Sequence, residues 1–436
     1  MQSYFRLKEN GTNVNTEVIA GISSFLATSY IIVVNPSILS QAGMPFSGVL
    51  TATVIVCFFS SLMMGLYAHN PILVAPGMGL NAFFTFSAVL GMHVPWPVAL
   101  GAVFWSGVIF LLLSAFNIRT YIVRAIPRPL RFAIAAGIGL FITLIGFANA
   151  KFIVANPATI ISVSPLNPTL LTFVAGLLVT AVLVIKNVRG AILLGILFTT
   201  LAAYPLGRWW GLGEGTSTLV NFKGILAAPD FSLLMKLDLV NSLQWAVVPV
   251  IFAFVFTDMF DSLSTLVGLA EAANLLDENG EPRNVKRALM TDAVATTLAG
   301  LVGSSPGTAY IESAVGIDAG GRTGLTAVVG GLLFLPFLFL APLLSVIPAI
   351  ATAPALVLVG VFMLRPVVKV NWMQLDEAIP AFLAMVLIPF TYSITQGIIW
   401  GFLSWTALKL ITGKTEDVNG ALLIIDIFCI AALIMH

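Results

Sequence analysis

Charged residues, cysteines and histidines are all scarce in this sequence. Only 9% of the 436 residues are charged, 59% are hydrophobic, and the mean hydropathy is +1.03. A soluble surface needs roughly a quarter of its residues charged, so a set of soluble domains is excluded. The 20 basic and 19 acidic residues give a net charge of +1, which provides no basic field to attract nucleic acid. Nucleic acid is therefore excluded as a partner.

The few cysteines and histidines form no recognisable site. Both cysteines lie in apolar runs, and the three histidines are scattered without ligand spacing: Cys57, Cys429, His69, His93 and His436. This pattern argues against a disulfide framework and against a zinc site. No residue implies a cofactor. The polar stretch 1–15 has the features of neither a secretory signal nor a transit peptide.

What the sequence has instead is a succession of long apolar stretches. A helix that crosses the hydrocarbon core needs about 20 apolar residues. We number fourteen candidate segments in chain order: 18–40, 46–68, 72–90, 96–116, 128–147, 168–186 and 190–206, then, after a polar stretch, 244–268, 288–302, 305–317, 323–345, 352–364, 377–391 and 395–411. The sequence therefore predicts an all-α polytopic membrane protein. The last apolar stretch, 421–436, contains Asp426 and fits either a short extra pass or a helix at the membrane interface.

The distribution of basic residues predicts the orientation, because Lys and Arg collect in cytoplasmic loops. With the N-terminus inside, 16 of the 20 basic residues fall on the cytoplasmic side. The other four are Lys151, Arg208, Lys223 and Lys236. A frame shifted by one segment would destroy this asymmetry, so we expect a cytoplasmic N-terminus.

Two Pro-Gly pairs mark the two halves of the chain. Seven segments repeated once give halves of opposite orientation. Pro76-Gly77 interrupts segment 3 and Pro306-Gly307 interrupts segment 10; the pairs lie 230 residues apart, close to half the chain length of 436. Proline and glycine break a helix and leave backbone groups unpaired unless they line a cavity or bond one another. Interruptions at matching positions of two halves predict the substrate site of a transporter, although two simple kinks would give the same pattern.

Three carboxylates fall inside predicted segments, whereas the others fall in loops or at segment ends. Asp258 and Asp261 lie in segment 8, three residues apart and so on one helical face, and Glu312 follows the break in segment 10. A charged carboxylate facing lipid at the helix centre costs roughly 2.5 to 3.5 kcal/mol. No basic residue occurs in segments 3, 8 or 10, so burial favours the protonated forms and predicts proton coupling. The alternative is that at least one of these acids only binds backbone amides freed by the breaks.

Two polar features near the breaks each allow two interpretations of their role. Asn81, among Leu80, Phe83 and Phe84, could bind the polar edge of a heterocycle or cap a half-helix. The glycine-rich run 320–324 could cradle an anion, but the predicted topology favours a tight cytoplasmic turn.

Several long strings resemble those of one family, the AzgA-like purine permeases of the nucleobase:cation symporter-2 family. They are 35–39 (NPSIL), 75–84 (APGMGLNAFF), 258–262 (DMFDS), 308–314 (TAYIESA) and 320–327 (GGRTGLTA). The resemblance implies fourteen segments in two inverted seven-span repeats, with short antiparallel strands breaking segments 3 and 10. It also implies a core domain of 1–118 and 241–346, a gate domain of 119–240 and 347–412, and a C-terminal tail of 413–436.

The same resemblance assigns the site and the function. It implies a purine site at Asn81, Asp258, Asp261, Thr308, Ala309, Tyr310 and Glu312, with both aspartates and Glu312 as proton-coupling residues. The function implied is proton-coupled import of hypoxanthine, guanine or adenine across a bacterial inner membrane. Sodium instead of the proton, and a homodimer, stay open. Leu263 and Ser264 depart from the usual pattern and leave the choice of purine open.

Two other functions fit parts of the pattern. The first is an anion transporter of related architecture, although acids without basic partners would repel an anion. The second is an intramembrane aspartyl protease, in which two carboxylates share a proton. A protease should place its acids on two facing helices, whereas Asp258 and Asp261 share one segment.

Overall fold

The structure is a computed structural model that describes residues 2–116, 127–209, 224–273, 275 and 282–434. Its helices follow the predicted segments closely. In the first half they are α1 (Val14–Thr28), α2 (Ile31–Leu39), α3 (Phe46–Leu66), α5 (Trp96–Ala115), α7 (Arg128–Asn149), α8 (Pro168–Ile185) and α9 (Ala191–Trp209). In the second half they are α10 (Val248–Ala273), α11 (Val285–Val302), α13 (Gly324–Leu332), α14 (Ala341–Leu344), α15 (Ala349–Leu364), α16 (Leu375–Thr391), α17 (Ile394–Ile411) and α18 (Gly420–Ile434).

The fold is a helical polytopic membrane fold, as predicted. Among the described residues, eight helical spans are long and apolar enough to cross a membrane. Segments 3, 10 and 11 are divided into shorter pieces, so the count of fourteen stays a prediction. Segment 1 consists of two helices, α1 and α2, that meet at Ser29 and Tyr30.

Segments 3 and 10 are both broken by a short strand, as predicted. Strand β1 (Val74–Pro76) leads into α4 (Met78–Ala82) and the π-helical η2 (Phe83–Gly91), and strand β4 (Gly307–Ala309) leads into η4 (Ile311–Ser313) and α12 (Ala314–Asp318). The two strands pair antiparallel, with Val74 opposite Ala309 and Pro76 opposite Gly307. The Gly77 N–H donates to Pro306 O at 2.9 Å. Each break therefore satisfies the backbone groups of the other, as the interior of a membrane requires.

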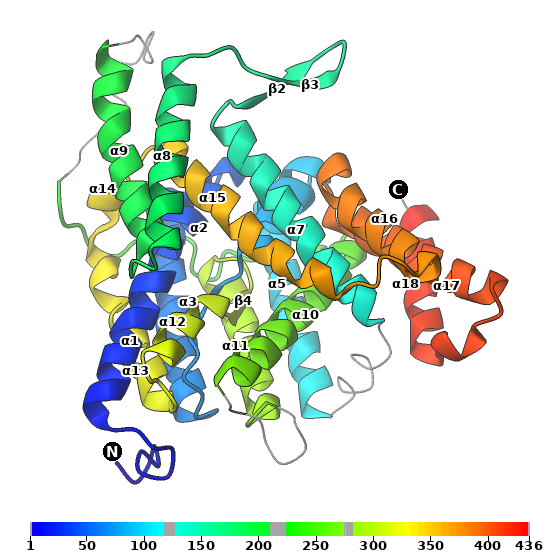
Figure 1. Ribbon diagram of the computed structural model, residues 1–436, viewed down its shortest axis with the longest axis horizontal. Coiled ribbons are helices and arrows are strands. Elements are labelled where there is room, and N and C mark those ends of the chain that lie inside the picture. The colour runs from blue at the N-terminus through cyan, green and yellow to red at the C-terminus, as the bar shows by residue number, and fades with distance from the viewer. Residues whose placement is uncertain (1, 117–126, 210–223, 274, 276–281, 435–436) are drawn as a thin grey trace.

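The helix pairings reflect two inverted repeats. Helix α3 (segment 2) packs against α13 (segment 11), and α5 (segment 4) packs against α11 (segment 9), which are equivalent pairs when the second half repeats the first. Small residues allow these close approaches: a Cβ on Gly324 would lie 1.9 Å from Gly65 O. A second group of helices lies beside the first. There α7 packs along α15 and α16, and α8 packs along α9 (Figure 1).

One hairpin was not predicted, and the role of the last apolar stretch was left open. An antiparallel hairpin of β2 (Ile153–Asn156) and β3 (Ile160–Val163) connects α7 to α8 and was not predicted. Helix α18 packs on α17, where Thr406 Oγ1 donates to Asp426 Oδ2 at 2.6 Å. The last apolar stretch thus forms a helix, and the hydrogen bond to Asp426 holds it against α17.

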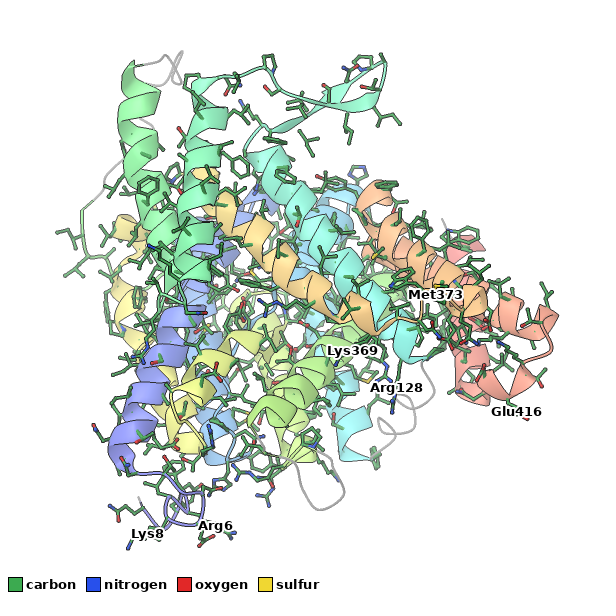
Figure 2. All side chains as sticks on the ribbon, viewed as in Figure 1. Arg6, Lys8, Arg128, Lys369, Met373 and Glu416 are labelled. Atoms are coloured by element: carbon green, nitrogen blue, oxygen red, sulfur yellow. The ribbon has the colours of Figure 1, made fainter. Side chains whose placement is uncertain are left out.

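Four cations of the predicted cytoplasmic set lie in the half of the molecule opposite the β2–β3 hairpin. Figure 2 shows Arg6 and Lys8, with Arg128 and Lys369 above them, in the lower half of the view, and the β2–β3 hairpin lies at the top of Figure 1. All four labelled cations belong to the predicted cytoplasmic set. The cytoplasmic location of the N-terminus remains a prediction.

Candidate substrate and coupling site

The candidate site lies around strand β4, which α10 and α11 hold from one side. Asp258 on α10 is 1% exposed. Thr296 Oγ1 on α11 donates to Asp258 Oδ2 at 2.5 Å and also contacts Gly307 O, the first strand carbonyl, at 3.2 Å. One turn along α10, Ser262 Oγ lies 2.8 Å from Thr308 Oγ1. Helix α10 is therefore tied to β4 at two points, once through α11 and once directly.

Glu312 follows β4 directly and is held from the other side by the junction of α1 and α2. The Tyr30 hydroxyl donates to Glu312 Oε1 at 2.6 Å, and Tyr30 is fully buried. The Tyr310 hydroxyl donates to Pro76 O at 2.6 Å and so bonds the two breaks together. The Tyr30 and Tyr310 rings lie 6.4 Å apart. A carboxylate oxygen with one strong donor keeps capacity for further partners.

The structure brings the three predicted acids together. Asp261 and Glu312 interact electrostatically, and so do Asp261 and Asp258. Asp261 and Glu312 are partly exposed, whereas Asp258 is buried. Within the described part of the chain, no ion pair joins any of the three to a basic residue. Two of the three carboxyl groups are thus partly exposed, and the third is buried.

The other predicted site residues are all buried, unlike Asp261 and Glu312. Thr308, Ala309 and Tyr310 are all buried, at 1%, 3% and 4% exposed. Asn81 is fully buried, and its Nδ2 donates to Asn35 Oδ1 at 3.2 Å. No side chain caps α4, so the predicted alternative of a half-helix cap at Asn81 is not what the structure shows. Direct contact between Asn81 and a substrate remains a prediction.

Asn35 is the centre of the polar network that contains Asn81. Its Nδ2 donates to Thr53 Oγ1 at 2.8 Å and to Ser304 Oγ at 3.1 Å, and its Oδ1 accepts from Ser305 Oγ at 3.1 Å. The network therefore connects α2, α3 and α4 to the residues just before β4. Asn81 Oδ1 is buried without a hydrogen-bond partner among the described residues, which leaves one acceptor beside the breaks.

A fourth carboxylate, Asp292, lies inside a predicted segment, and Glu17, at the start of α1 where an acid was expected, is buried as well. Asp292 on α11 and Glu17 on α1 are both 0% exposed. Asp292 interacts electrostatically with Asp258, and its position inside predicted segment 9 was a signal that could have found it. Tyr30 and Thr296 had no such signal, because their roles come from partners 282 and 38 residues away.

An apolar cavity in the described part of the chain does not coincide with the acids. It has a volume of about 150 Å³ and lies between α10, α17 and α18, with Phe252, Ala253 and Thr395 among its lining residues. None of its lining residues is charged. None of the predicted site residues lines this cavity.

Comparisons with known proteins agree with this fold and chemistry. A family model described as "Permease family" matches residues 15–399. The adenine permease AdeP of Escherichia coli (strain K12) is 42% identical over 437 residues, covering 100% of this chain and 96% of that protein. The guanine/hypoxanthine permease PbuO of Bacillus subtilis (strain 168) is 38% identical over 429 residues, covering 97% and 98%. The transmembrane domain of the cyanobacterium bicarbonate transporter BicA matches with a TM-score of 0.66 at 16% identity, covering 88% and 97%, which shows a shared fold.

Proposed function

Since the chain belongs to this permease family, we propose that it imports purine nucleobases together with protons. The chain is a membrane transporter and not an enzyme, so the protease alternative falls away. Its relatives are named as permeases for adenine or for guanine and hypoxanthine. The observation that carries the proposal is the interacting pair Asp261 and Glu312, partly exposed and without a basic partner among the described residues.

The chemistry of the site suits a neutral planar heterocycle. A purine presents N–H donors and ring-nitrogen acceptors along its edges. A carboxylate accepts from such donors, and a protonated carboxyl also donates. Asp261 and Glu312 would bind these edges, while the backbone at Thr308, Ala309 and Tyr310 would bound the site and Asn81 would support it. An anion would meet only repulsion here, which disfavours the anion-transport alternative.

Coupling follows from the cost of moving a charge in the membrane. An unneutralised carboxylate costs several kcal/mol in hydrocarbon, so uptake of a proton lowers the barrier to movement of the loaded site. We propose that helices of 1–118 and 241–346 carry the site past a gate of 119–240 and 347–412. Loss of the proton on the cytoplasmic side then releases the purine.

The test is Glu312→Gln in proteoliposomes. We expect the variant to insert normally and to lose accumulation of radiolabelled adenine, guanine or hypoxanthine against a gradient, because the amide cannot exchange a proton. Glu9→Gln is the matched control, since Glu9 is exposed and pairs only loosely with Arg6 at 3.9 Å. Normal accumulation by Glu312→Gln would refute the coupling role.

A further inference from the structure

The glycine-rich turn 320–324, between α12 and α13, holds a carboxylate from the other repeat. Glu17 Oε1 accepts from the Arg322 N–H at 2.9 Å, and Oε2 accepts from Thr326 Oγ1 at 2.6 Å. Oε2 also lies 3.2 Å from the Thr326 N–H and 3.3 Å from the Thr323 N–H. The run is thus both a turn and an anion cradle, and the anion it holds is part of the chain.

This cradle is suited to a negative charge. Its donors are the N–H groups of Arg322, Thr323 and Thr326, around the start of α13, and the Thr326 hydroxyl. The start of a helix carries the positive end of its dipole. Arg283 Nη2 donates to Arg322 O at 2.8 Å, and the Arg283 guanidinium interacts electrostatically with Glu17. Glu17 is 0% exposed, so removal of its carboxylate would take the acceptor from the Arg322 and Thr323 N–H groups and from the Thr326 hydroxyl.

Helix α1 runs from this cradle to the candidate site. At its start Glu17 binds the turn, and just beyond its end Tyr30 binds Glu312 at 2.6 Å. The thirteen intervening steps span about 20 Å of helix. Between the two ends, α1 packs on α12 so closely that a Cβ on Gly316 would lie 1.9 Å from Ser24 Oγ. Figure 1 shows α1 beside α12 and α13, and hydrogen bonds join each end of this stretch, through Glu17 and Tyr30, to the part of the chain that carries Glu312.

We propose that Glu17 is a positioning residue, an internal anion that fixes the register of α1 and thereby places the Tyr30 hydroxyl on Glu312. This inference rests on the proposed role of Glu312 in purine binding. It differs from that role because Glu17 contacts no substrate: it acts through α1, about 20 Å away.

Chemical rescue tests the cradle independently of transport. Glu17→Ala removes a CH2–COO⁻ group, which acetate matches in size and charge. We expect Glu17→Ala to melt at a lower temperature than the wild type in detergent, and sodium acetate to raise its Tm more than sodium chloride at equal ionic strength. Formate should act similarly, whereas propionate should be too long. The wild type, with its cradle filled, should show no acetate-specific shift.

Asp426→Ala is the matched control for this rescue. Asp426 is also buried, but Thr406 Oγ1 is the donor to its Oδ2, and its Oδ1 has no partner in the described part of the chain. Asp426→Ala removes only a COO⁻ group, which formate matches in size, so formate is tested beside acetate. We expect neither anion to shift the Tm specifically, because the described donor to this carboxylate is one hydroxyl and not a set of N–H groups. Equal shifts in Glu17→Ala and Asp426→Ala, or no shift in either, would overturn the cradle.

Purine affinity in detergent tests the positioning role, and it avoids the collapse of a pH gradient that acetate would cause in vesicles. We expect Glu17→Ala to weaken binding of adenine, guanine or hypoxanthine about tenfold and acetate to restore it. This loss corresponds to that of a hydrogen bond to a charged group. Restored Tm without restored affinity would overturn the positioning role.

Two milder variants keep the test decisive if Glu17→Ala does not fold. Glu17→Gln keeps the volume but not the charge, and Thr326→Val removes only the hydroxyl donor at 2.6 Å. Both should weaken purine binding by a few fold, and unchanged affinity in both would overturn the proposal. If the wild type binds no purine at all, the proposed function fails, while the acetate-dependent Tm still reports on the cradle.

Discussion

Thr296→Val offers a sharp test of how α11 holds the site, because one hydroxyl makes two contacts there. Thr296 Oγ1 lies 2.5 Å from Asp258 Oδ2 and 3.2 Å from Gly307 O. Asp258 Oδ1 already has no hydrogen-bond partner among the described residues. Valine keeps the branched shape of threonine but removes the hydroxyl that donates to Asp258 Oδ2.

The expected magnitude follows from these two contacts. A hydrogen bond to a charged group contributes about 1.5 to 3 kcal/mol, and a neutral one about 0.5 to 1.5 kcal/mol. Because one hydroxyl carries one proton, it donates fully to only one of these acceptors, and the expected loss is that of a single bond, about 1 to 3 kcal/mol. The neighbouring Thr297 is the control, because its Oγ1 donates only to Ala293 O, one turn earlier on the same helix, at 2.8 Å. Thr297→Val should therefore cost at most about 1 kcal/mol.

The assay is unfolding of both variants in an SDS titration, paired with purine uptake in proteoliposomes. We expect Thr296→Val to lose stability by the larger amount and to take up purine at least about tenfold more slowly, since β4 loses its attachment to Asp258. Equal stability and uptake in the two valine variants would refute the view that Thr296 connects α10 to the strand.

Three further predictions concern other parts of the molecule. Tyr30→Phe should weaken purine binding about tenfold or more, because it removes the donor to Glu312 at 2.6 Å. Tyr4→Phe should leave binding unchanged, since the Tyr4 hydroxyl donates to Leu66 O on an exposed part of the chain. Calorimetric titration of both variants with purine measures the difference. Gly324→Ala should lower the free energy of unfolding by at least about 2 kcal/mol, because its Cβ would lie 1.9 Å from Gly65 O. Gly420→Ala is the control, since a Cβ there meets nothing within 4 Å. Equal melting temperatures of the two variants would contradict this packing. At the start of α16, outside the predicted segment 377–391, hydrogen bonds from Lys409 and Lys414 lower the pKa of Asp376 from 3.8 to about 2. The stabilisation from Asp376 should thus be complete above about pH 4 and be lost as the pH falls towards 2, and Lys409→Met should reduce this dependence of Tm on pH.

The helices and breaks could be predicted because they depend on local properties. Hydropathy located α3 at 46–66 within the predicted 46–68, and α17 at 394–411 against 395–411. The Pro-Gly pairs located both strands, because proline and glycine disfavour a helix whatever surrounds them. The hairpin β2–β3 was missed, since it lies in a connection with no strong hydropathic signal.

The site was predicted only in part, for a physical reason. Intramembrane acids are costly wherever they occur, so Asp258, Asp261 and Glu312 could be identified from the sequence. Their partners are ordinary residues that gain a role only through contacts across the fold, such as Tyr30 with Glu312 and Glu17 with the turn at Arg322. Nothing in the local sequence distinguishes such a tyrosine or threonine from many others in a membrane helix.

The most direct test of the central claim is the proton flux that accompanies purine entry. Purified protein in proteoliposomes containing a pH-sensitive dye would be given external adenine, guanine or hypoxanthine without sodium. Proton symport predicts acidification of the interior in step with purine uptake, and loss of both signals in Glu312→Gln. Purine uptake without acidification, or uptake that requires sodium, would contradict the claim that these carboxyl groups carry the proton.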